Sequence, residues 1–296
     1  MTCDCCPRYC EVDRQAGEKG FCRAGSVPSV ALHDLHLWEE PPISGKRGSG
    51  AVFFSRCNLR CVFCQNHAIS QGDEAGEEMP PERLADVFLS LEARGAHNVN
   101  LVSPTHFSLE IARAMRIARD RGLSIPFVYN SNGYDSPETL ARMGGLADVY
   151  LPDLKYRSGD LSVRYSSAPG YFEHATRAIK EMSRQAGTAL LGPDGTIRKG
   201  LIVRHLVLPG CVDDSILVLR WIKDNLPPGT YVSVMSQYYP CHRAAQFPQI
   251  DRRLTQDEYG RVLDEMDRLG LQNGFVQELS SAEPGYTPDF RRKSAR

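Results

Sequence analysis

Three cysteines in the spacing CxxxCxxC place the strongest constraint on what this chain can fold into. Cys57, Cys61 and Cys64 directly follow residues 51–54, an apolar run typical of a short strand. Electron-transfer clusters of four irons are ordinarily held by four cysteines, so three thiolates leave one iron without a protein ligand. The spacing therefore predicts a [4Fe-4S] cluster at the end of a strand, with its fourth iron open to a ligand from outside the chain.

Structural or zinc-binding cysteines are the alternative, because cysteines two residues apart recur in zinc sites. The nearest fourth zinc ligand, His67, stands at a spacing that suits neither common zinc pattern. S-adenosylmethionine (SAM) is the usual ligand of an open cluster iron, and Phe63 lies just before the last cysteine, where an aromatic ring fits against adenine. We therefore favour a cluster that binds SAM over a zinc site.

Composition narrows the class of protein. The chain has 296 residues, 42% of them hydrophobic, and a net charge of −1, which argues against a general nucleic-acid binder. The first thirty residues carry five cysteines and no apolar core of a signal peptide, and no run approaches the ~18 apolar residues of a membrane span. We expect a cytoplasmic protein whose ten cysteines bind metal rather than form disulfides, with no membrane contact.

Strand-like and helix-like segments alternate along most of the chain. Apolar strand patterns alternate with patterns of helical spacing six times, with strands at 51–54, 99–102, 126–129, 149–151, 201–208 and 231–235. Such units form parallel strands joined by right-handed crossovers, so we expect an α/β fold with a partial or complete barrel. Residues 187–200 interrupt the pattern as a hairpin centred on Pro193-Asp194-Gly195.

Polar side chains follow the second and third predicted strands. Ser103 and Thr105 could bind the amino group of a methionine moiety, although the same residues suit a helix N-cap turn. Asn130 and Asn132 could hydrogen-bond a ribose or a carboxylate, although Asn-Gly at 132–133 is also a common turn. Because the chemistry of such barrels lies at the carboxyl ends of the strands, these residues are candidate cofactor ligands.

Charged and aromatic side chains mark the later strand ends. Asp153 and Lys155 share one face of an extended segment and suit the ammonium, hydroxyl and carboxylate groups of an amino-acid-bearing cofactor, with a local ion pair as the alternative. Arg204 and His205 interrupt an apolar strand, and we expect Arg204 to point inward to a carboxylate unless it forms a buried structural ion pair. Tyr238 follows the sixth strand, where it could contact cofactor or substrate.

Together these motifs resemble the activating-enzyme branch of the radical SAM superfamily, proteins similar to the pyruvate formate-lyase activating enzyme. The resemblance covers roughly residues 49–240 and is carried by Gly50-Ala51-Val52-Phe53-Phe54, Cys57/Cys61/Cys64, Asn132-Gly133, Asp153-Leu154-Lys155, Arg204 and Val207-Leu208-Pro209-Gly210. It implies a partial (β/α)6 TIM-type barrel over residues 49–280, a cysteine-rich extension over 1–48 and a tail over 281–296. It also implies that the amino and carboxylate groups of SAM bind the open iron.

This sequence departs from that family at three positions. Ser103-Pro104-Thr105 replaces a Gly-Gly-Glu stretch, Asn130 stands where an acid is expected, and Tyr238 stands where a histidine is expected. The chain is most similar to an uncharacterised offshoot of the family that also carries cysteines at its N-terminus. In this chain those cysteines are Cys3, Cys6, Cys10 and Cys22, with Cys5 as a spare. Four thiolates at this spacing suit a zinc ion or an auxiliary iron–sulfur cluster. The alternative is a loose cysteine-rich segment that binds no metal.

The predicted function is reductive cleavage of SAM at the cluster, giving a 5′-deoxyadenosyl radical that abstracts hydrogen from a substrate. The substrate is a protein, a glycyl-radical enzyme among the candidates, or else another peptide or a small molecule. An electron donor such as flavodoxin or ferredoxin is the expected partner. A structural zinc or nucleic-acid-binding module and a SAM-binding regulator without catalysis are the competing hypotheses. The basic run Arg291-Arg292-Lys293 is expected to be a solvated end of the chain.

Overall fold

One ten-stranded sheet organises the computed structural model, which describes residues 2–72, 76–283, 285 and 288–290. The strands are Ser29–His36 (β1), Ser49–Phe54 (β2), Glu77–Glu78 (β3), Val99–Val102 (β4), Phe127–Asn130 (β5), Val149–Tyr150 (β6), Leu190–Leu191 (β7), Ile197–Leu206 (β8), Tyr231–Met235 (β9) and Gly274–Val276 (β10). Their order is β10-β9-β8-β6-β5-β4-β2-β1-β3, with β7 paired to β8. The sheet is therefore open, with β10 and β3 at its two edges.

Parallel pairing runs without a break from β2 to β10. This confirms the expected α/β fold with a partial barrel, because the six predicted strands correspond to β2, β4, β5, β6, β8 and β9. The expected hairpin in 187–200 is also confirmed: β7 pairs antiparallel with β8, and the Gly192 N–H donates to the Thr196 carbonyl across the turn at 2.7 Å.

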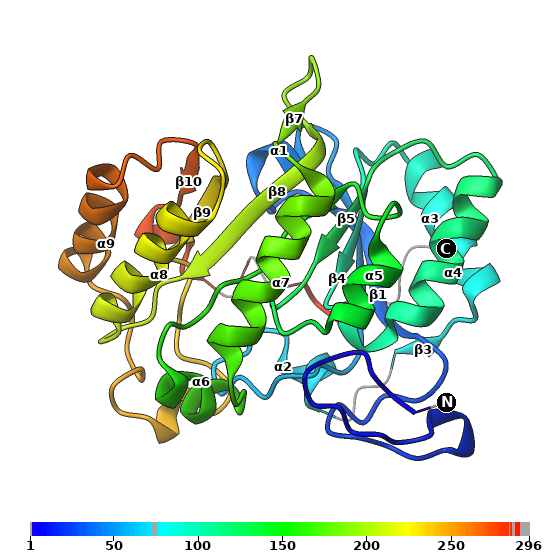
Figure 1. The fold of residues 1–296 in the computed structure, drawn as a ribbon, viewed down its shortest axis with the longest axis horizontal. Helices are drawn as coiled ribbons and strands as arrows, with labels where there is room; N and C mark the ends of the chain where they lie inside the picture. The colour runs from blue at the N-terminus through cyan, green and yellow to red at the C-terminus, as the bar shows by residue number, and fades with distance from the viewer. Residues whose placement is uncertain (1, 73–75, 284, 286–287, 291–296) are drawn as a thin grey trace.

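Helices cover one face of this sheet (Figure 1). The longer ones are Pro81–Ala93 (α3), Ser108–Asp120 (α4), Pro137–Met143 (α5), Gly159–Ser166 (α6), Tyr171–Ala186 (α7), Val212–Asn225 (α8) and Gln256–Arg268 (α9). Short helices are Pro41–Ser44 (α1) and His67–Ser70 (α2), and 3-10 turns are Arg14–Ala16 (η1), Thr105–Phe107 (η2), Ala244–Gln246 (η3) and Leu279–Ser281 (η4).

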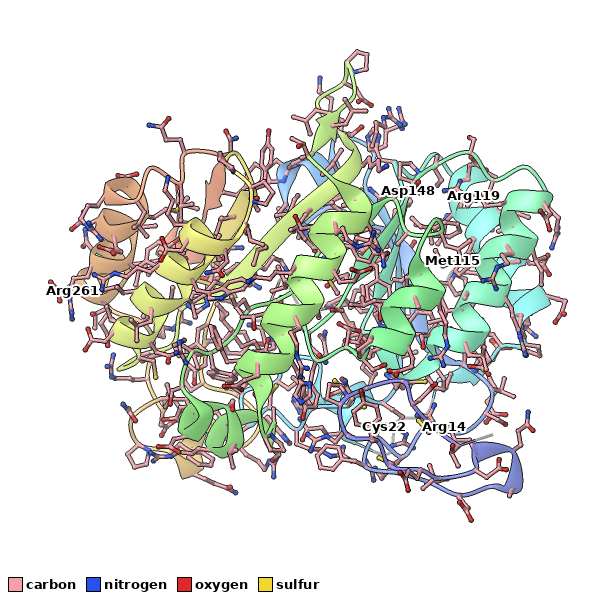
Figure 2. All side chains as sticks on the ribbon, viewed as in Figure 1. Arg14, Cys22, Met115, Arg119, Asp148 and Arg261 are labelled. Atoms are coloured by element: carbon pink, nitrogen blue, oxygen red, sulfur yellow. The ribbon has the colours of Figure 1, made fainter. Side chains whose placement is uncertain are left out.

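Local signals fix where these helices begin and how they attach to the sheet. Thr255 and Glu258 form a reciprocal capping box at the start of α9. Arg119 of α4 lies 2.7 Å from Asp148, which precedes β6, and the pair lies at the amino-terminal edge of the strands (Figure 2). The same Asp148 carboxylate accepts the Phe127 N–H at 2.8 Å, so it joins α4 to the starts of two strands.

Alternation along the strands sorts side chains between two faces of the sheet. In β5, Phe127 and Tyr129 pack into the large core between sheet and helices, whereas Val128 belongs to a small inner cluster with Ile43 of α1. Asn130 continues the inner series at the end of the strand. The strand ends therefore point their inner side chains into the concave side of the sheet, at the edge where α2, α6 and the N-terminal segment lie (Figure 1).

The sequence did not predict β1, α6 and β10, nor the short elements β3, α1 and α2. β1, within the segment expected as an extension, pairs antiparallel with β2 and β3. α6 and the seventh parallel strand, β10, were also missed, because each is too short for periodicity to identify. The expected basic tail at 291–296 lies outside the described residues, and the proposed boundaries at 48 and 280 stay predictions.

Within the described part of the chain, no helix combines the length and the apolar character that crossing a bilayer requires.

Gly133 offers a test of how tightly the strand ends are packed. Its φ is +79°, and a Cβ there would lie 2.3 Å from the Asp153 carbonyl oxygen. Gly145 has a similar φ of +75° with nothing within 4 Å of such a Cβ. Gly145→Ala should lower the free energy of unfolding by about 1–2 kcal/mol for left-handed backbone, and Gly133→Ala by roughly a further 1–3 kcal/mol for the clash. Denaturant unfolding followed by circular dichroism measures both; equal losses would contradict the packing described.

Candidate active site

A cavity of about 510 Å³ opens at the carboxyl ends of the strands. It gathers side chains from segments far apart in sequence, and all the cofactor residues predicted from the sequence except Thr105 line it. Those residues are Cys57, Cys61, Phe63, Cys64, Ser103, Asn130, Asn132, Asp153, Lys155, Arg204 and Tyr238. The alternation and parallel order that the sequence predicts thus place these groups around one space.

Thr105 does not line the cavity. It lies in η2, is 1% exposed, and donates its hydroxyl hydrogen to the buried Asp135 carboxylate at 2.8 Å. The chain turns away from the cavity at Ser103, whose φ of +57° is unusual for a residue with a side chain. The backbone reversal therefore directs Thr105 into the polar network behind the strand ends, where Tyr129 and Ser131 also donate to Asp135.

The loop that carries the three cavity cysteines is held by other segments of the chain. The Arg60 N–H donates to the Ser166 carbonyl at 3.0 Å and the Val62 N–H to the Tyr165 carbonyl at 2.8 Å, which ties the loop to α6. The Asn58 amide donates to the Tyr134 carbonyl at 2.7 Å. These bonds fix the backbone between the cysteines although it has no regular secondary structure.

Each of the three sulfurs has a polar side chain beside it. Asn132 Nδ2 donates to Cys57 Sγ at 3.4 Å. The hydroxyl of Ser166 lies 3.0 Å from Cys61 Sγ. The hydroxyl of Ser70 lies 3.3 Å from Cys64 Sγ. Donors of this kind stabilise negative charge on sulfur, so the surroundings suit thiolates that bind metal.

Burial makes these cysteines weak acids when they carry no metal. It raises the pKa of the Cys57 thiol to about 11 and that of Cys64 to about 12, and it raises the pKa of Cys61 as well. Repulsion between the neighbouring sulfurs adds to the effect at Cys57 and Cys64. Iron must therefore displace the thiol protons when it binds. A bound cluster would keep the sulfurs as thiolates, the charged form that burial disfavours in the absence of metal.

The donor set fits a four-iron cluster better than a single ion. Among the residues that the structure describes, no three His, Cys, Asp or Glu side chains surround one ion position. In a [4Fe-4S] cluster each cysteine binds a different iron, so its ligands stand further apart than those of one ion. Three hydrogen-bonded cysteines on one cavity wall therefore suit a cluster with one open iron.

A buried charged group lines the same cavity. Asp153 lies 2.9 Å from Arg204 Nε and 2.5 Å from Lys155 Nζ. Burial alone would raise the pKa of Asp153, but the two cations outweigh it and hold that pKa below its usual value. Burial would lower the pKa of Lys155, but Asp153 and Cys61 outweigh it and raise that pKa. All three groups therefore remain charged near neutral pH.

Arg204 points inward, as predicted, and it also forms the ion pair that was the alternative. It donates to Asn130 Oδ1 at 2.6 Å in addition to Asp153. His205 points the other way, with Nδ1 2.7 Å from the Leu154 carbonyl oxygen. The alternation of side chains along β8 thus separates a cavity cation from a structural histidine.

Two buried acids near Arg204 were missed in the sequence. Glu39 lies 3.4 Å from Arg204 Nη1 and accepts from Asn100 Nδ2 at 3.1 Å. Glu40 is 8% exposed, and burial raises the pKa of both carboxyls against the opposing charge of Arg204. Both precede α1 in a loop without periodicity, so only their position between Trp38 and two prolines could have drawn attention to them.

Two aromatic side chains complete the lining. Phe63 and Tyr238 meet edge to face with ring centroids 5.7 Å apart. The Tyr238 hydroxyl donates to the Ile250 carbonyl at 2.5 Å, which leaves the ring as its contribution to the cavity. This apolar corner next to the cysteine loop suits a planar base.

The cysteines predicted as a second metal site, Cys3, Cys6, Cys10 and Cys22, lie outside this cavity in the N-terminal segment. Cys6 and Cys22 are buried, and all ten cysteines of the chain are free thiols in the structure.

Comparisons with known proteins agree with this geometry. The model of the "Radical SAM superfamily" matches residues 51–200. "Uncharacterized protein MJ0674" of Methanocaldococcus jannaschii is 32% identical over 280 residues, which cover 91% of this chain and 75% of the relative. "Uncharacterized protein MJ0808" of the same organism is 24% identical over 270 residues, covering 84% and 73%.

Solved structures share the fold. Streptococcus suis SuiB bound to S-adenosylmethionine superposes with a TM-score of 0.55 at 14% identity, over 78% of this chain and 50% of SuiB. SuiB bound to the precursor peptide SuiA gives a TM-score of 0.54 at 13% identity, over 78% and 49%. This chain therefore spans about half the length of SuiB. The family match, the M. jannaschii relative and the cysteine-lined cavity together show that the chain belongs to the radical SAM superfamily.

Proposed function

We propose that this chain is an activating-enzyme-like radical SAM enzyme in which Cys57, Cys61 and Cys64 hold a [4Fe-4S] cluster. The observation that carries the proposal is that these thiols share one cavity with the charged group of Asp153, Lys155 and Arg204. When bound, the cluster supplies one electron to the SAM sulfonium, whose sulfur–C5′ bond breaks to give methionine and a 5′-deoxyadenosyl radical that takes a hydrogen atom from the substrate.

The charged residues have the chemistry to orient the amino-acid part of SAM. We assign Lys155 and Arg204 to its carboxylate and Asp153 to its ammonium or hydroxyl groups, since each carries the complementary charge at low exposure. Charge-assisted bonds of this kind gain strength where water is excluded. Ser103 is placed at the same strand-end edge and adds a hydroxyl group.

The remaining lining residues suit the nucleoside. We assign Asn130 and Asn132 to the ribose, because their amides face the cavity at the end of β5. Phe63 and Tyr238 offer ring surface for the adenine. Packing of these groups around SAM would exclude water from the radical, which is the main demand that such chemistry makes on the protein.

The proposed substrate is a peptide or protein, and a glycyl-radical enzyme is the candidate that the family likeness favours. Leu37 and Trp38 line the cavity with 54% and 62% of their surfaces exposed, so its rim has an apolar surface of the kind that binds side chains of a partner. SuiB, which shares the fold, has been solved with a precursor peptide. We further propose a flavodoxin or ferredoxin as electron donor and a cytoplasmic location.

Anaerobic turnover tests the proposed function. Protein reconstituted with iron and sulfide and incubated with dithionite and SAM should release 5′-deoxyadenosine, measured by chromatography. Cys57→Ala, Cys61→Ala and Cys64→Ala should each abolish the product, because the cluster loses one of its three ligands. Cys241→Ser, whose sulfur donates to the Phe63 carbonyl at 3.3 Å, should retain it. Wild-type protein with an intact cluster that releases no 5′-deoxyadenosine would refute the proposal.

The hydroxyl groups beside the sulfurs should tune the cluster. Hydrogen bonds to cluster sulfurs stabilise the more negative, reduced state, so Ser166→Ala and Ser70→Ala should each lower the reduction potential. A net bond of about 1 kcal/mol corresponds to about 40 mV, given about 59 mV per 1.4 kcal/mol for one electron. Ser90→Ala, an exposed change on α3, is the control. An EPR-monitored redox titration measures the shift, and unchanged potentials in both variants would exclude this tuning.

A further inference from the structure

The N-terminal segment carries five cysteines that the cavity does not use. Between residues 2 and 28 the structure has one 3-10 turn, η1, and an isolated bridge between Thr2 and Asp13. Cys5, Cys6 and Cys22 are nevertheless buried, at 7%, 6% and 5% exposure. A segment with so little backbone pairing and so small a core ordinarily needs a metal or a disulfide to stay folded, and these thiols are free.

The backbone around these cysteines repeats one feature of the cavity cysteines. The Tyr9 N–H donates to the Cys6 carbonyl at 3.1 Å, which closes a tight turn after that cysteine. The cavity loop has the same turn after two of its cysteines, where the Cys64 N–H donates to the Cys61 carbonyl at 3.3 Å and the His67 N–H to the Cys64 carbonyl at 3.2 Å. The chain around Cys6 is therefore folded back as it is around the cavity cysteines.

Left-handed backbone next to two of these cysteines supports the same conclusion. Tyr9 and Glu11, on either side of Cys10, have φ of 41° and 55°, and Arg23, after Cys22, has φ of 60°. Such conformations are costly for residues with side chains and persist where the surroundings impose them, often at ligand sites. The sulfurs of Cys10 and Cys22 can reach a shared ligand only if the chain turns tightly at both cysteines.

The charge around the sulfurs is also that of a thiolate site. Each of Cys6 and Cys22 interacts electrostatically with Cys3 and Cys10, so the four sulfurs share one neighbourhood. Arg14 Nη2 lies 3.4 Å from Cys22 Sγ, and both residues lie within the N-terminal loops (Figure 2). A half-buried guanidinium beside these sulfurs favours negative charge on them, which metal-bound thiolates supply.

Cys5 differs from the other four. Its side chain is buried, at 7% exposure. Its carbonyl accepts from the Thr139 hydroxyl at 2.6 Å, which fixes the Cys5 backbone against α5. Cys3, Cys6, Cys10 and Cys22 already supply four thiols, and Cys5, whose backbone is held by α5, is the one left over.

We propose that Cys3, Cys6, Cys10 and Cys22 bind a second metal centre through four thiolates, a zinc ion or an iron–sulfur cluster, and that this centre holds the cavity loop in place. The four sulfurs surround no single ion position in the described chain, so a zinc ion would draw them closer, whereas a cluster spans wider ligands. The site is separate from the SAM cavity and does not depend on the proposed function.

The contacts that connect the two sites come from residues adjacent to these cysteines. Arg8, between Cys6 and Cys10, donates to the Asn58 carbonyl of the cavity loop at 3.1 Å and to the Ser167 carbonyl. The Phe21 carbonyl, next to Cys22, accepts from Arg60 of the same loop at 2.6 Å. Fixing Cys6, Cys10 and Cys22 on one metal therefore fixes the partners of the loop that carries Cys57 and Cys61.

Metal analysis in a background without the cavity cysteines tests the site alone. In the Cys57→Ala/Cys61→Ala/Cys64→Ala variant, isolated anaerobically, we expect either about one zinc or about four irons with matching sulfide per chain. Adding Cys6→Ser and Cys22→Ser should remove that metal, whereas adding Cys5→Ser should not. Iron with sulfide identifies a cluster and zinc a structural ion; absence of both after reconstitution, or metal retained without Cys6 and Cys22, would overturn the proposal.

Variants of the same cysteines test whether the second metal centre holds the cavity loop in place. With the cavity cysteines intact, Cys6→Ser/Cys22→Ser should raise amide hydrogen exchange in residues 56–62 by about tenfold relative to Cys5→Ser, since lost anchors favour local opening. Exchange in α9, far from the segment, should stay unchanged and shows that the variant is folded. Equal exchange of the loop in the two variants would refute the anchoring role while leaving 5′-deoxyadenosine formation as a separate question.

Discussion

The cysteine loop after β2 is the part of the structure on which the rest depends, because it holds three thiols in one cavity wall without any secondary structure of its own. Its backbone is fixed from outside, by Ser166 and Tyr165 carbonyls at α6 and by Arg8 of the N-terminal segment. Its sulfurs lie within hydrogen-bonding distance of Asn132, Ser166 and Ser70. The positions of the three cysteines that a metal cluster requires are thus fixed by contacts with segments from most of the barrel.

Buried charge is the second constraint. Asp153, Lys155 and Arg204 lie together where isolated ions would be strongly disfavoured, and they remain charged because each has an opposite partner within 2.9 Å. Such a group is poorly suited to stabilising a core, where apolar residues serve as well. It is well suited to binding a zwitterionic ligand, because the ligand's ammonium can pair with the acidic side chains and its carboxylate with the basic ones.

Sequence periodicity predicted the sheet and most of the cavity for a simple physical reason: alternation along parallel strands decides which side chains face inward. Asn130, Asp153 and Arg204 were found in this way, and so was the outward direction of His205. Thr105 was placed wrongly with respect to the cavity because the left-handed Ser103 reverses the chain there. Glu39 and β10 were missed because a loop and a three-residue strand carry no period. β1 is eight residues long but buries only Val30 and Leu32, so its sequence shows little alternation of buried and exposed residues.

EPR spectroscopy of the dithionite-reduced protein, with and without SAM, tests the central claim most directly. If three cysteines hold a four-iron cluster whose fourth iron faces the charged group, SAM should bind that iron and change the g values of the reduced cluster, and isotopic labelling of its amino nitrogen should produce a resolved hyperfine coupling. A signal that saturating SAM leaves unaltered, in protein with a full complement of iron and sulfide, would contradict the account.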